Sequence, residues 1–469
     1  MKAVEKIFRE YDIRGVVEVD FDAAFARRLG EVYAELVLEG ALQPKPSAAS
    51  IVASPVIAVG TDCRLTADEL SQALIEGITS RGIKVLKTGV GPSPQLYYMV
   101  IANNLAGGIQ VTASHNPSDQ NGFKLMIGPK TLSGPDIQLI KERVFASSPA
   151  QSIPKGAVEV VDARLKYLDE LISRSKERMG KRKLKVVVDA GNGVGGLVGP
   201  DLLRALGCEV IELFCDADGR FPNHHPDPTV MENIVELRKR VVAEKADLGI
   251  GWDGDADRIG VVDENAEPIF GDMLLAIYAR TLLKEVPGAT IIGEVKCSEH
   301  LYEDIVRQGG VPIMAKTGHS LIKAKLKETH AALAGEMSGH MFFAYRYFGF
   351  DDAIHASARL VEILSNTDKK ISELLDGIPK SYSTPEIRLD CPEEIKFQVS
   401  ERAKGLFNEY ETLTIDGVRI KFQHGWGLVR ASNTQPALVM RFEATTPELL
   451  KEYQQLVEGR IEKLKASLS

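Results

Sequence analysis

Short apolar runs alternate with amphipathic stretches over the first three quarters of the chain. Residues 56–62, 184–193 and 289–298 each form an apolar run that ends in a polar or glycine turn. A stretch of helical period and then a second apolar run follow each of them. Apolar runs connected through amphipathic helices are typical of right-handed βαβ units with a largely parallel sheet. The pattern therefore predicts three related α/β units in succession.

In each predicted unit a third apolar run ends in a polar loop. The three loops lie in the segments GGIQVTASHNP (107–117), LGIGWDGDADR (248–258) and LAGEMSGH (333–340). Ligands of open α/β sheets bind beyond the carboxyl ends of the strands. We therefore expect three related domains to direct three different loops into one central cleft.

The last part of the chain has a different pattern. Two strand-like runs, GVRIKFQ and ALVMRFEAT, flank the polar loop RASNTQP (430–436), and a long amphipathic helix follows. This order predicts a smaller C-terminal α+β domain. We thus expect an α/β protein with three topologically related domains, each with a mixed or parallel sheet, and the small domain, all around a central cleft. The expected domains are residues 1–154, 155–267, 268–378 and 379–469.

Composition and charge exclude several classes of protein. The 469 residues include 57 Lys and Arg against 65 Asp and Glu, a net charge of −8 without blocks of like charge, so a nucleic-acid-binding surface is not expected. The five cysteines are scattered and never spaced as CxxC, which argues against disulfides or a zinc site and favours a reducing compartment. The charged N-terminus does not resemble a signal peptide, and no run reaches the roughly 18 apolar residues of a membrane span. We expect a cytoplasmic protein that binds no membrane.

The segment DGDADR places three carboxylates at alternate positions, Asp253, Asp255 and Asp257. An EF-hand loop shares this spacing, but it needs glycine at its sixth position, where the chain has Arg258, and helices rather than strands on its flanks. A haloacid-dehalogenase-like phosphatase also begins with Asp-x-Asp after a strand, but it favours Thr or Val at the position of Asp257. A solvated acidic turn would leave three carboxylates to repel one another. We therefore expect a site for a divalent metal ion.

Ser114 stands in TASHNP, directly after an apolar run and next to His115, Asn116 and Pro117. Serine, asparagine and proline after a strand often form only a turn or a helix cap. The chemical alternative is a serine on an exposed, tight loop that acts as a nucleophile or carries a phosphoryl group. Both interpretations are open from this motif alone.

Two further loops carry groups that suit an anionic sugar ligand. Glu336 and Ser338 of GEMSGH offer oxygen atoms that can bind sugar hydroxyl groups. RASNTQP combines a guanidinium, hydroxyls, an amide and backbone N–H groups, which can enclose a phosphate dianion. The residues concerned are Arg430, Ser432, Asn433 and Thr434. Arg430 could instead be a surface ion-pair partner, but the clustering of these residues favours a phosphate site.

The segment GNGVGG (191–196) matches the glycine pattern of dinucleotide-binding turns. It follows a strand-like run and precedes a helical stretch, and Glu212 stands about twenty residues further on. The corresponding turns of the other two repeats carry GTD and GEVK, which indicates a structural turn between strand and helix. Binding of NAD remains the alternative from another reaction class.

Taken together, these motifs resemble the α-D-phosphohexomutase superfamily. TASHNP, DGDADR, GEMSGH and RASNTQP occur in that order, one in each predicted domain, and FREYDIRG opens the chain as in the bacterial members. GEMSGH is similar to the bacterial phosphomannomutase/phosphoglucomutase branch. The phosphoglucosamine mutase branch usually has Gln in place of Met337, and that activity is the nearest alternative. A NAD-dependent enzyme that uses GNGVGG is a more remote one.

The resemblance implies reversible interconversion of the 1- and 6-phosphates of mannose, glucose or both. Ser114 would carry a phosphoryl group and exchange it with the sugar through a 1,6-bisphosphate, so glucose 1,6-bisphosphate would be both activator and intermediate. One Mg²⁺ per chain would be held by Ser114, Asp253, Asp255 and Asp257. The partners would be small sugar phosphates, and we expect the chain to act as a monomer.

The resemblance also assigns roles to single residues. Lys296 and His319 would be the general acid and base. Glu336 and Ser338 would bind O3 and O4, the hydroxyl groups that glucose and mannose share, and a phosphate would bind to RASNTQP. The other expected catalytic residues are Tyr11, Arg14, Lys124 and Arg258, and His340 is expected to contact the substrate.

Overall fold

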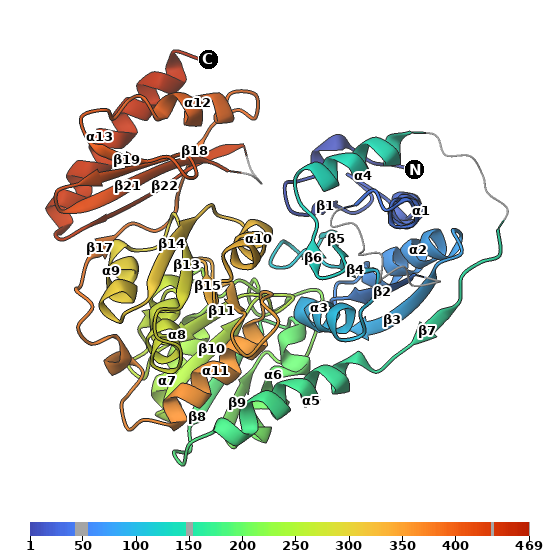
Figure 1. Cartoon of the computed structure of the whole chain (residues 1–469), viewed down its shortest axis with the longest axis horizontal. Coiled ribbons are helices and arrows are strands. Elements are labelled where there is room, and N and C mark those ends of the chain that lie inside the picture. The colour runs from blue at the N-terminus through green and yellow to red at the C-terminus, as the bar shows by residue number, and fades with distance from the viewer. Residues whose placement is uncertain (43–54, 147–152, 433–435, 469) are drawn as a thin grey trace.

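The computed structural model describes residues 1–42, 55–146, 153–432 and 436–468. These residues form four β-sheets, one in each of four successive parts of the chain (Figure 1). We refer to the parts as the first, second, third and C-terminal domains. Among the described residues, no helix combines the length and the apolar character that a membrane crossing requires.

The first sheet has seven strands, and TASHNP begins near the end of a central one. Across the sheet the strands are β1 (Ile13–Val16), β5 (Gln120–Ile127), β4 (Gly107–Val111), β2 (Val56–Thr61), β3 (Lys84–Val90) and β7 (Val158–Val160), with β6 (Lys130–Thr131) beside β5. The helices are α1 (Ala23–Glu39), α2 (Ala67–Thr79), α3 (Ser93–Ala102) and α4 (Pro135–Phe145). Strand β7 lies beyond residue 154, where a boundary is expected, and pairs with β3. The first sheet thus continues past that position.

The second and third sheets are smaller. The second contains β12 (Pro268–Ile269), β11 (Ile259–Val262), β10 (Leu248–Trp252), β8 (Lys185–Asp189) and β9 (Glu209–Leu213), with helices α5 (Ala163–Ser175), α6 (Gly199–Ala205) and α7 (Val235–Glu244). The third contains β14 (Val311–Ala315), β13 (Thr290–Glu294), β15 (Leu333–Gly335) and β16 (Met341–Phe343). Its helices are α8 (Gly271–Glu285), α9 (Glu299–Arg307), α10 (His319–Thr329) and α11 (Ala353–Ser365).

These three sheets share one topology. Four strands run in the orders β5-β4-β2-β3, β11-β10-β8-β9 and β16-β15-β13-β14. In each sheet the first of these strands along the chain pairs in parallel with the second and the third. The fourth strand returns antiparallel to the third. The prediction of three related α/β domains is confirmed, and the polar loops lie at the turn between the third and fourth strands.

The C-terminal domain has an antiparallel sheet covered by two helices. Its strands are β17 (Tyr382–Ser383), β22 (Ala437–Ala444), β21 (Gly425–Ala431), β20 (Val418–Phe422) and β19 (Glu411–Leu413), with β18 (Ile387–Asp390) also beside β22. The helices are α12 (Lys396–Ala403) and α13 (Pro447–Ala466). Residues of both helices pack on the sheet in a separate hydrophobic core. This arrangement confirms the expected α+β domain.

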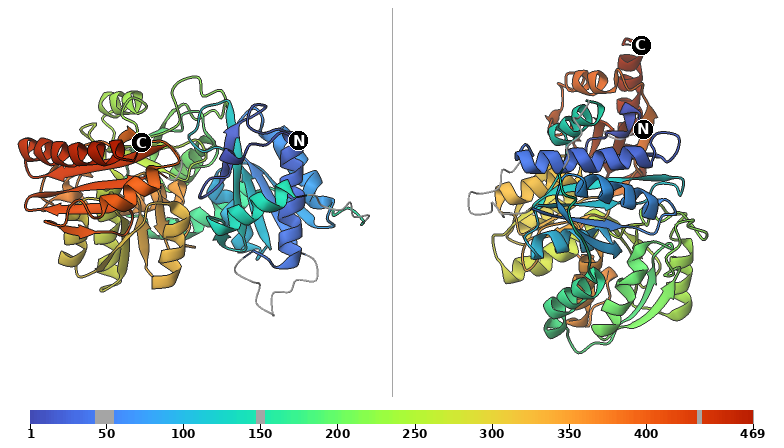
Figure 2. Two further views of the ribbon diagram at one scale, coloured as in Figure 1. Left: turned by 90° about the horizontal axis from the view of Figure 1, so that it is seen from above. Right: turned by 90° about the vertical axis from the view of Figure 1, so that its right-hand side faces the viewer.

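One hydrophobic core joins the first three domains. It contains residues of α3 from the first domain together with the sheets and helices of the second and third. All 13 residues of α11 are buried, because this helix contacts elements of both the second and the third domain. The first and C-terminal domains lie toward opposite ends of the molecule, and the second and third domains connect them (Figures 1 and 2). The loop ends of the first three sheets therefore have fixed positions relative to one another.

Candidate functional site

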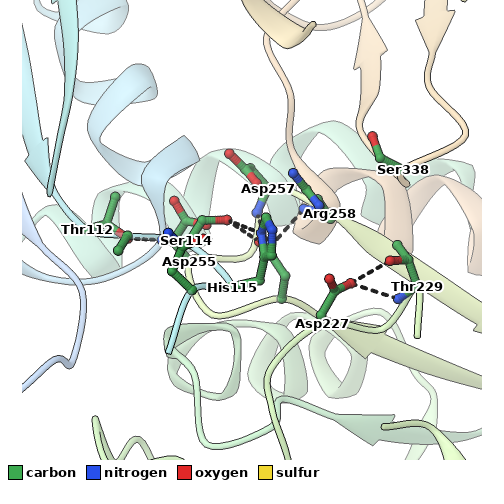
Figure 3. A network of polar contacts seen from close by, with 12 residues as sticks. Thr112, Ser114, His115, Asp227, Thr229, Asp255, Asp257, Arg258 and Ser338 are labelled. Carbon is green, nitrogen blue, oxygen red and sulfur yellow. Dashed lines mark hydrogen bonds and ion pairs between the residues drawn. The ribbon is translucent and has the colours of Figure 1, made fainter. Parts of the chain in front are cut away.

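Loops from the first three domains meet at one place (Figure 3). The Ser114 hydroxyl donates to Oδ2 of Asp253 over 2.6 Å, which connects the first loop to the second. The N–H of Ile259 donates to the carbonyl of Gly339 over 3.1 Å, which connects the second loop to the third. The structure thus brings TASHNP, DGDADR and GEMSGH together at the carboxyl ends of three strands, where α/β sheets bind ligands.

Ser114 has an unusual backbone conformation and is not exposed. Its φ is 52°, in the left-handed region that non-glycine residues rarely adopt. Its N–H donates to Oγ1 of Thr112 over 2.9 Å. Only 1% of the residue is exposed, so the expectation of an exposed serine is wrong. The reason is the second domain: Gly254 lies so close that a Cβ there would be 2.3 Å from the Ser114 carbonyl oxygen.

The three aspartates of DGDADR are fully buried and form one cluster. One carboxylate oxygen of each lies within 4.8 Å of the others. Burial and the charges of Asp257 and Asp255 raise the pKa of Asp253 well above its usual value. Burial acts in the same sense on Asp257, but Lys124 and His340 outweigh it and hold the pKa of Asp257 well below its usual value. The Ser114 hydroxyl thus lies directly beside a buried cluster of three carboxyl groups.

Lys124 of β5 reaches this cluster from the first domain. Its Nζ lies 2.6 Å from Oδ2 of Asp255 and also forms a short contact with Asp257. Burial would lower the pKa of Lys124, but the two carboxylates outweigh it and raise that pKa well above its usual value. Lys124 is therefore a permanent cation within the site.

The opening motif FREYDIRG also lies at the site. Nη1 of Arg14 donates to the carbonyl of Ala113 over 3.3 Å, and Nε lies 2.7 Å from Asp12. The Tyr11 hydroxyl donates to the carbonyl of Thr317 over 2.9 Å, which links the first domain to the third. Arg14 thus lies next to TASHNP, and Tyr11 lies next to the segment that precedes His319.

Glu336 and His340 form a charged pair in the third loop. Nδ1 of His340 lies 2.7 Å from Oε2 of Glu336, and Nε2 lies 3.3 Å from Asp257. Burial opposes both charges, but His340 outweighs it at Glu336, whose pKa falls to about 2. Asp257 and, to a smaller extent, Glu336 outweigh it at His340, whose pKa rises to about 9. Nε of Arg258 lies 3.3 Å from Nε2 of His340, and the Ser338 hydroxyl lies 3.2 Å from Nδ1 of His340. Arg258 and Ser338 both appear in Figure 3.

His319 and Lys296 have opposite electrostatic environments. Burial, together with the charge of Lys323, lowers the pKa of His319, although its Nδ1 lies 2.9 Å from Asp351. Burial would also lower the pKa of Lys296, but Glu294 at 4.0 Å and Glu386 at 3.1 Å outweigh it and raise that pKa. At neutral pH His319 is therefore a neutral proton acceptor and Lys296 is a cation.

The fourth loop approaches the third domain. Nε of Arg430 donates to Asp416 over 2.8 Å, and the same carboxylate oxygen accepts from the N–H of Thr317 over 3.1 Å. Arg430 and Ser432 are both 5% exposed. The remaining predicted residues of this loop, Asn433 and Thr434, lie outside the described residues.

The turn GNGVGG packs against the DGDADR loop. The N–H of Val194 donates to the carbonyl of Gly254 over 3.1 Å, and a Cβ on Gly193 would lie 2.7 Å from that carbonyl oxygen. The following residues, Val194–Leu197, form a 3-10 segment rather than the start of an α-helix. A pyrophosphate needs the space and the N–H groups that this contact takes up, so the turn is structural.

Sequence reasoning missed the carboxylates that orient the candidate groups. Asp351, Glu386 and Asp416 lie 32, 90 and 14 positions along the chain from the residues they bond, His319, Lys296 and Arg430. Residues so far apart in the sequence form no local motif that would predict these contacts. Glu294 is the exception: it stands in the turn GEVK, two positions before Lys296, whose N–H it accepts over 2.8 Å.

Family models match all four parts of the chain. They describe the α/β/α domains I, II and III and the C-terminal domain of phosphoglucomutase/phosphomannomutase, and they match residues 5–151, 165–267, 270–382 and 386–459.

Relatives that match over nearly their full length are named phosphoglucomutase or phosphomannomutase/phosphoglucomutase. A phosphomannomutase/phosphoglucomutase of Pseudomonas aeruginosa is 44% identical over 98% of this chain and 96% of its own, and a phosphoglucomutase of Neisseria gonorrhoeae is 42% identical over 97% and 96%. A crystal structure of a phosphoglucomutase/phosphomannomutase family protein from Burkholderia thailandensis covers 99% of this chain and 98% of its own, with a TM-score of 0.89 at 39% identity. The chain therefore belongs to the phosphoglucomutase/phosphomannomutase family of the α-D-phosphohexomutases and is a phosphohexomutase, an intramolecular phosphotransferase.

Proposed function

We propose that the enzyme interconverts the 1- and 6-phosphates of glucose and mannose through a phosphoserine at Ser114 and a 1,6-bisphosphate. The observation that carries this proposal is the 2.6 Å contact between the Ser114 hydroxyl and Asp253 at the point where three domains meet. A phosphorylated Ser114 would donate its phosphoryl group to the free hydroxyl of the sugar. The bisphosphate would then return its other phosphoryl group to Ser114.

One Mg²⁺ would be held by Asp253, Asp255 and Asp257 together with an oxygen on Ser114. Clustered carboxylates suit this hard cation, and Oδ1 of Asp255 lacks a hydrogen-bond partner among the described residues, which leaves it available as a ligand. When bound, the ion would offset negative charge on the transferring phosphoryl group. Lys124, Arg14 and Arg258 would supply further positive charge there. An Aspergillus fumigatus N-acetylphosphoglucosamine mutase of similar fold, at 15% identity and a TM-score of 0.61, was solved with GlcNAc-6P and magnesium.

The proton would be taken by His319. Because its Nδ1 faces Asp351, the neutral ring would keep its proton on Nδ1 and present Nε2 as the acceptor. Lys296 would act as the acid or as a fixed cation.

The sugar and its second phosphate would be held on the other side of the site. Glu336 is ionised at neutral pH and would accept from sugar hydroxyl groups with Ser338, at O3 and O4. Since glucose and mannose share O3 and O4, both sugars would bind. His340 would hold Glu336 in place, and Arg430 and Ser432, with Asn433 and Thr434, would bind the phosphate that does not react.

The proposed substrates agree with the names of the relatives, which combine phosphomannomutase with phosphoglucomutase. The five cysteines are all free, which supports a reducing compartment such as the cytoplasm.

The test is a coupled mutase assay with glucose 1-phosphate, mannose 1-phosphate and glucosamine 1-phosphate, primed with catalytic glucose 1,6-bisphosphate. We expect turnover of the first two and a phosphopeptide that contains phosphorylated Ser114. Ser114→Ala should lose most activity, because no oxygen then remains to carry the phosphoryl group. Ser118→Ala is the matched control, since Ser118 is an exposed serine of the same loop. A fully active Ser114→Ala variant, or turnover of glucosamine 1-phosphate alone, would contradict the proposal.

A further inference from the structure

Arg64, three residues beyond the end of β2, is a buried arginine that holds the loop around TASHNP, which we call the serine loop. Its five N–H groups all have acceptors: Nε lies 3.2 Å from Asp62, and the remaining donors bind four carbonyl groups between Ser114 and the first residue of β5. Nη1 of Arg64 donates to Pro117 (2.6 Å) and Gln120 (2.9 Å), and Nη2 donates to Ser114 (2.9 Å) and Asn116 (2.5 Å). Few side chains can bind so many backbone groups at once, because only the guanidinium offers five donors in a fixed plane.

The arginine and its counter-ion are sealed from water. The side chains of Arg64 and Asp62 are 0% and 1% exposed. Asp62 also accepts from Oγ1 of Thr112 over 2.6 Å, and that hydroxyl oxygen accepts the N–H of Ser114. Ser114 is thus held at its N–H through Thr112 and at its carbonyl through Arg64. Removing one partner from such a buried ion pair or hydrogen bond destabilises the folded protein, because the other partner stays buried without a counter-charge or a donor.

The second domain closes over the same arginine. The guanidinium carbon lies 5.1 Å from the centre of the Phe221 ring, and a Cβ on Gly219 would lie 2.3 Å from the carbonyl oxygen of Cys63. The Cys63 thiol also lies 3.5 Å from the carbonyl oxygen of Asn192, in the GNGVGG turn. Arg64 therefore lies between the serine loop and the second domain, which carries the three aspartates.

We propose that Arg64 is a positioning residue for phosphoryl transfer, which holds Ser114 in its left-handed conformation against Asp253. The inference rests on the proposed function of Ser114. A φ of 52° is unfavourable for serine and persists only where the surroundings fix it. Without Arg64, the carbonyl of Ser114 loses its donor and the loop relaxes, which moves the hydroxyl away from the acidic cluster. The groups proposed to bind the sugar and its second phosphate belong to the third and C-terminal domains, so they stay in place.

This role predicts a loss in kcat with little change in KM. For Arg64→Met we expect kcat to fall about 10- to 100-fold, which is typical of misplacement by about 1 Å. KM for glucose 1-phosphate should stay within about threefold. Arg81→Met is the matched control, because Arg81 is also a buried arginine of the first domain but pairs with Glu35 (2.8 Å) and Glu31 (3.4 Å), away from the loop. The control should lose thermal stability and keep its kcat.

A milder pair of variants tests the same network if Arg64→Met does not fold. Thr112→Val removes the oxygen that accepts the Ser114 N–H, whereas Thr112→Ser keeps it. We expect Thr112→Val to lower kcat and the rate at which labelled phosphoenzyme transfers its phosphoryl group to glucose 1-phosphate, and Thr112→Ser to restore both. The inference is overturned if kcat stays within threefold of the wild type in Arg64→Met and Thr112→Val, or if Arg81→Met loses as much kcat.

Measurements on the wild-type protein distinguish this outcome from a failure of the proposed function. If wild-type protein carries phosphate on Ser114 and turns over hexose phosphates, unchanged kinetics in the variants reject the role of Arg64 alone. If the wild type has no phosphate on Ser114 and Ser114→Ala stays active, the proposed function fails, and the role of Arg64 fails with it.

Discussion

Asp351 and Lys323 act on the pKa of His319 in opposite directions. Asp351 favours the protonated ring, Lys323 disfavours it, and burial, the largest effect, lowers the pKa. If His319 is the general base, activity is lost as the pH falls through its pKa, because the ring then carries a proton. Asp351→Asn should therefore move the acidic limb of kcat/KM to lower pH, and Lys323→Gln should move it to higher pH. Stopped assays of both variants across the pH range measure the two shifts.

The same pair of variants separates positioning from charge. Asp351→Asn also removes the acceptor that fixes the proton on Nδ1, so kcat should fall by about 100-fold or more even at the best pH. Lys323→Gln keeps that acceptor and should retain most of kcat. Shifts of the same sign in both variants would show that another group is the base.

At the scale of single residues, the sequence motifs indicate what chemistry a side chain could perform, but they do not indicate how deeply it is buried or which residues surround it. The motifs predict a phosphoryl carrier at Ser114 and a metal ligand at Asp253, because a hydroxyl oxygen and a carboxylate suit these two roles. The burial of Ser114 does not follow, because Gly254 of another domain covers it. The same limit applies to Asp351, whose bond to His319 spans 32 positions and depends on the fold of the third domain.

At the scale of elements, the loop after β13 is held by strands of the C-terminal domain. Nη1 of Arg419 in β20 donates to the carbonyl groups of Val295 (2.8 Å) and Cys297 (2.9 Å), and its guanidinium lies 3.9 Å from the Trp426 ring. Arg441 of β22 donates to the carbonyl of Lys296 between them. The placement of Lys296 therefore depends on the docking of another domain.

Arg419→Met should loosen this docking. The variant leaves two buried carbonyl groups without donors, which costs about 1–3 kcal/mol for each. We expect faster proteolysis between the third and C-terminal domains and a lower kcat, because Lys296 loses its support. Arg460→Met is the control: Arg460 of α13 donates to the carbonyl of Leu406 over 2.7 Å within the C-terminal domain. Equal proteolysis of the two variants would contradict the role of the interface.

The repeated strands were predictable because their signals are local. An apolar run, a turn and an amphipathic helix together occupy about thirty residues and predict a βαβ unit with parallel strands. The contacts of Arg419 carry no such signal, since they join residues more than 120 positions apart. Sequence patterns thus predicted the domains and their loops, but not how the C-terminal domain docks.

At the scale of the whole molecule, the proposed metal site joins two domains. The three aspartates belong to the second domain, whereas Ser114 and Lys124 belong to the first. A cation that binds only the folded site stabilises the folded state of the two domains by RT ln(1 + [Mg²⁺]/Kd). This amounts to about 2.7 kcal/mol when the Mg²⁺ concentration is a hundred times Kd. Mg²⁺ should therefore raise Tm by a few degrees after treatment with EDTA, and it should restore the turnover that EDTA abolishes.

A matched variant tests whether this stabilisation comes from the acidic cluster. Asp253→Asn removes one charge from the three carboxylates and should abolish the rise in Tm with Mg²⁺. Asp218→Asn is the control, because Asp218 is an acidic residue of the second domain that pairs with Arg220 over 2.6 Å, outside the cluster. This control should keep the full Mg²⁺ effect. The assignment is contradicted if exhaustively chelated enzyme remains fully active, or if Asp253→Asn responds to Mg²⁺ as the wild type does, since the ion would then bind elsewhere.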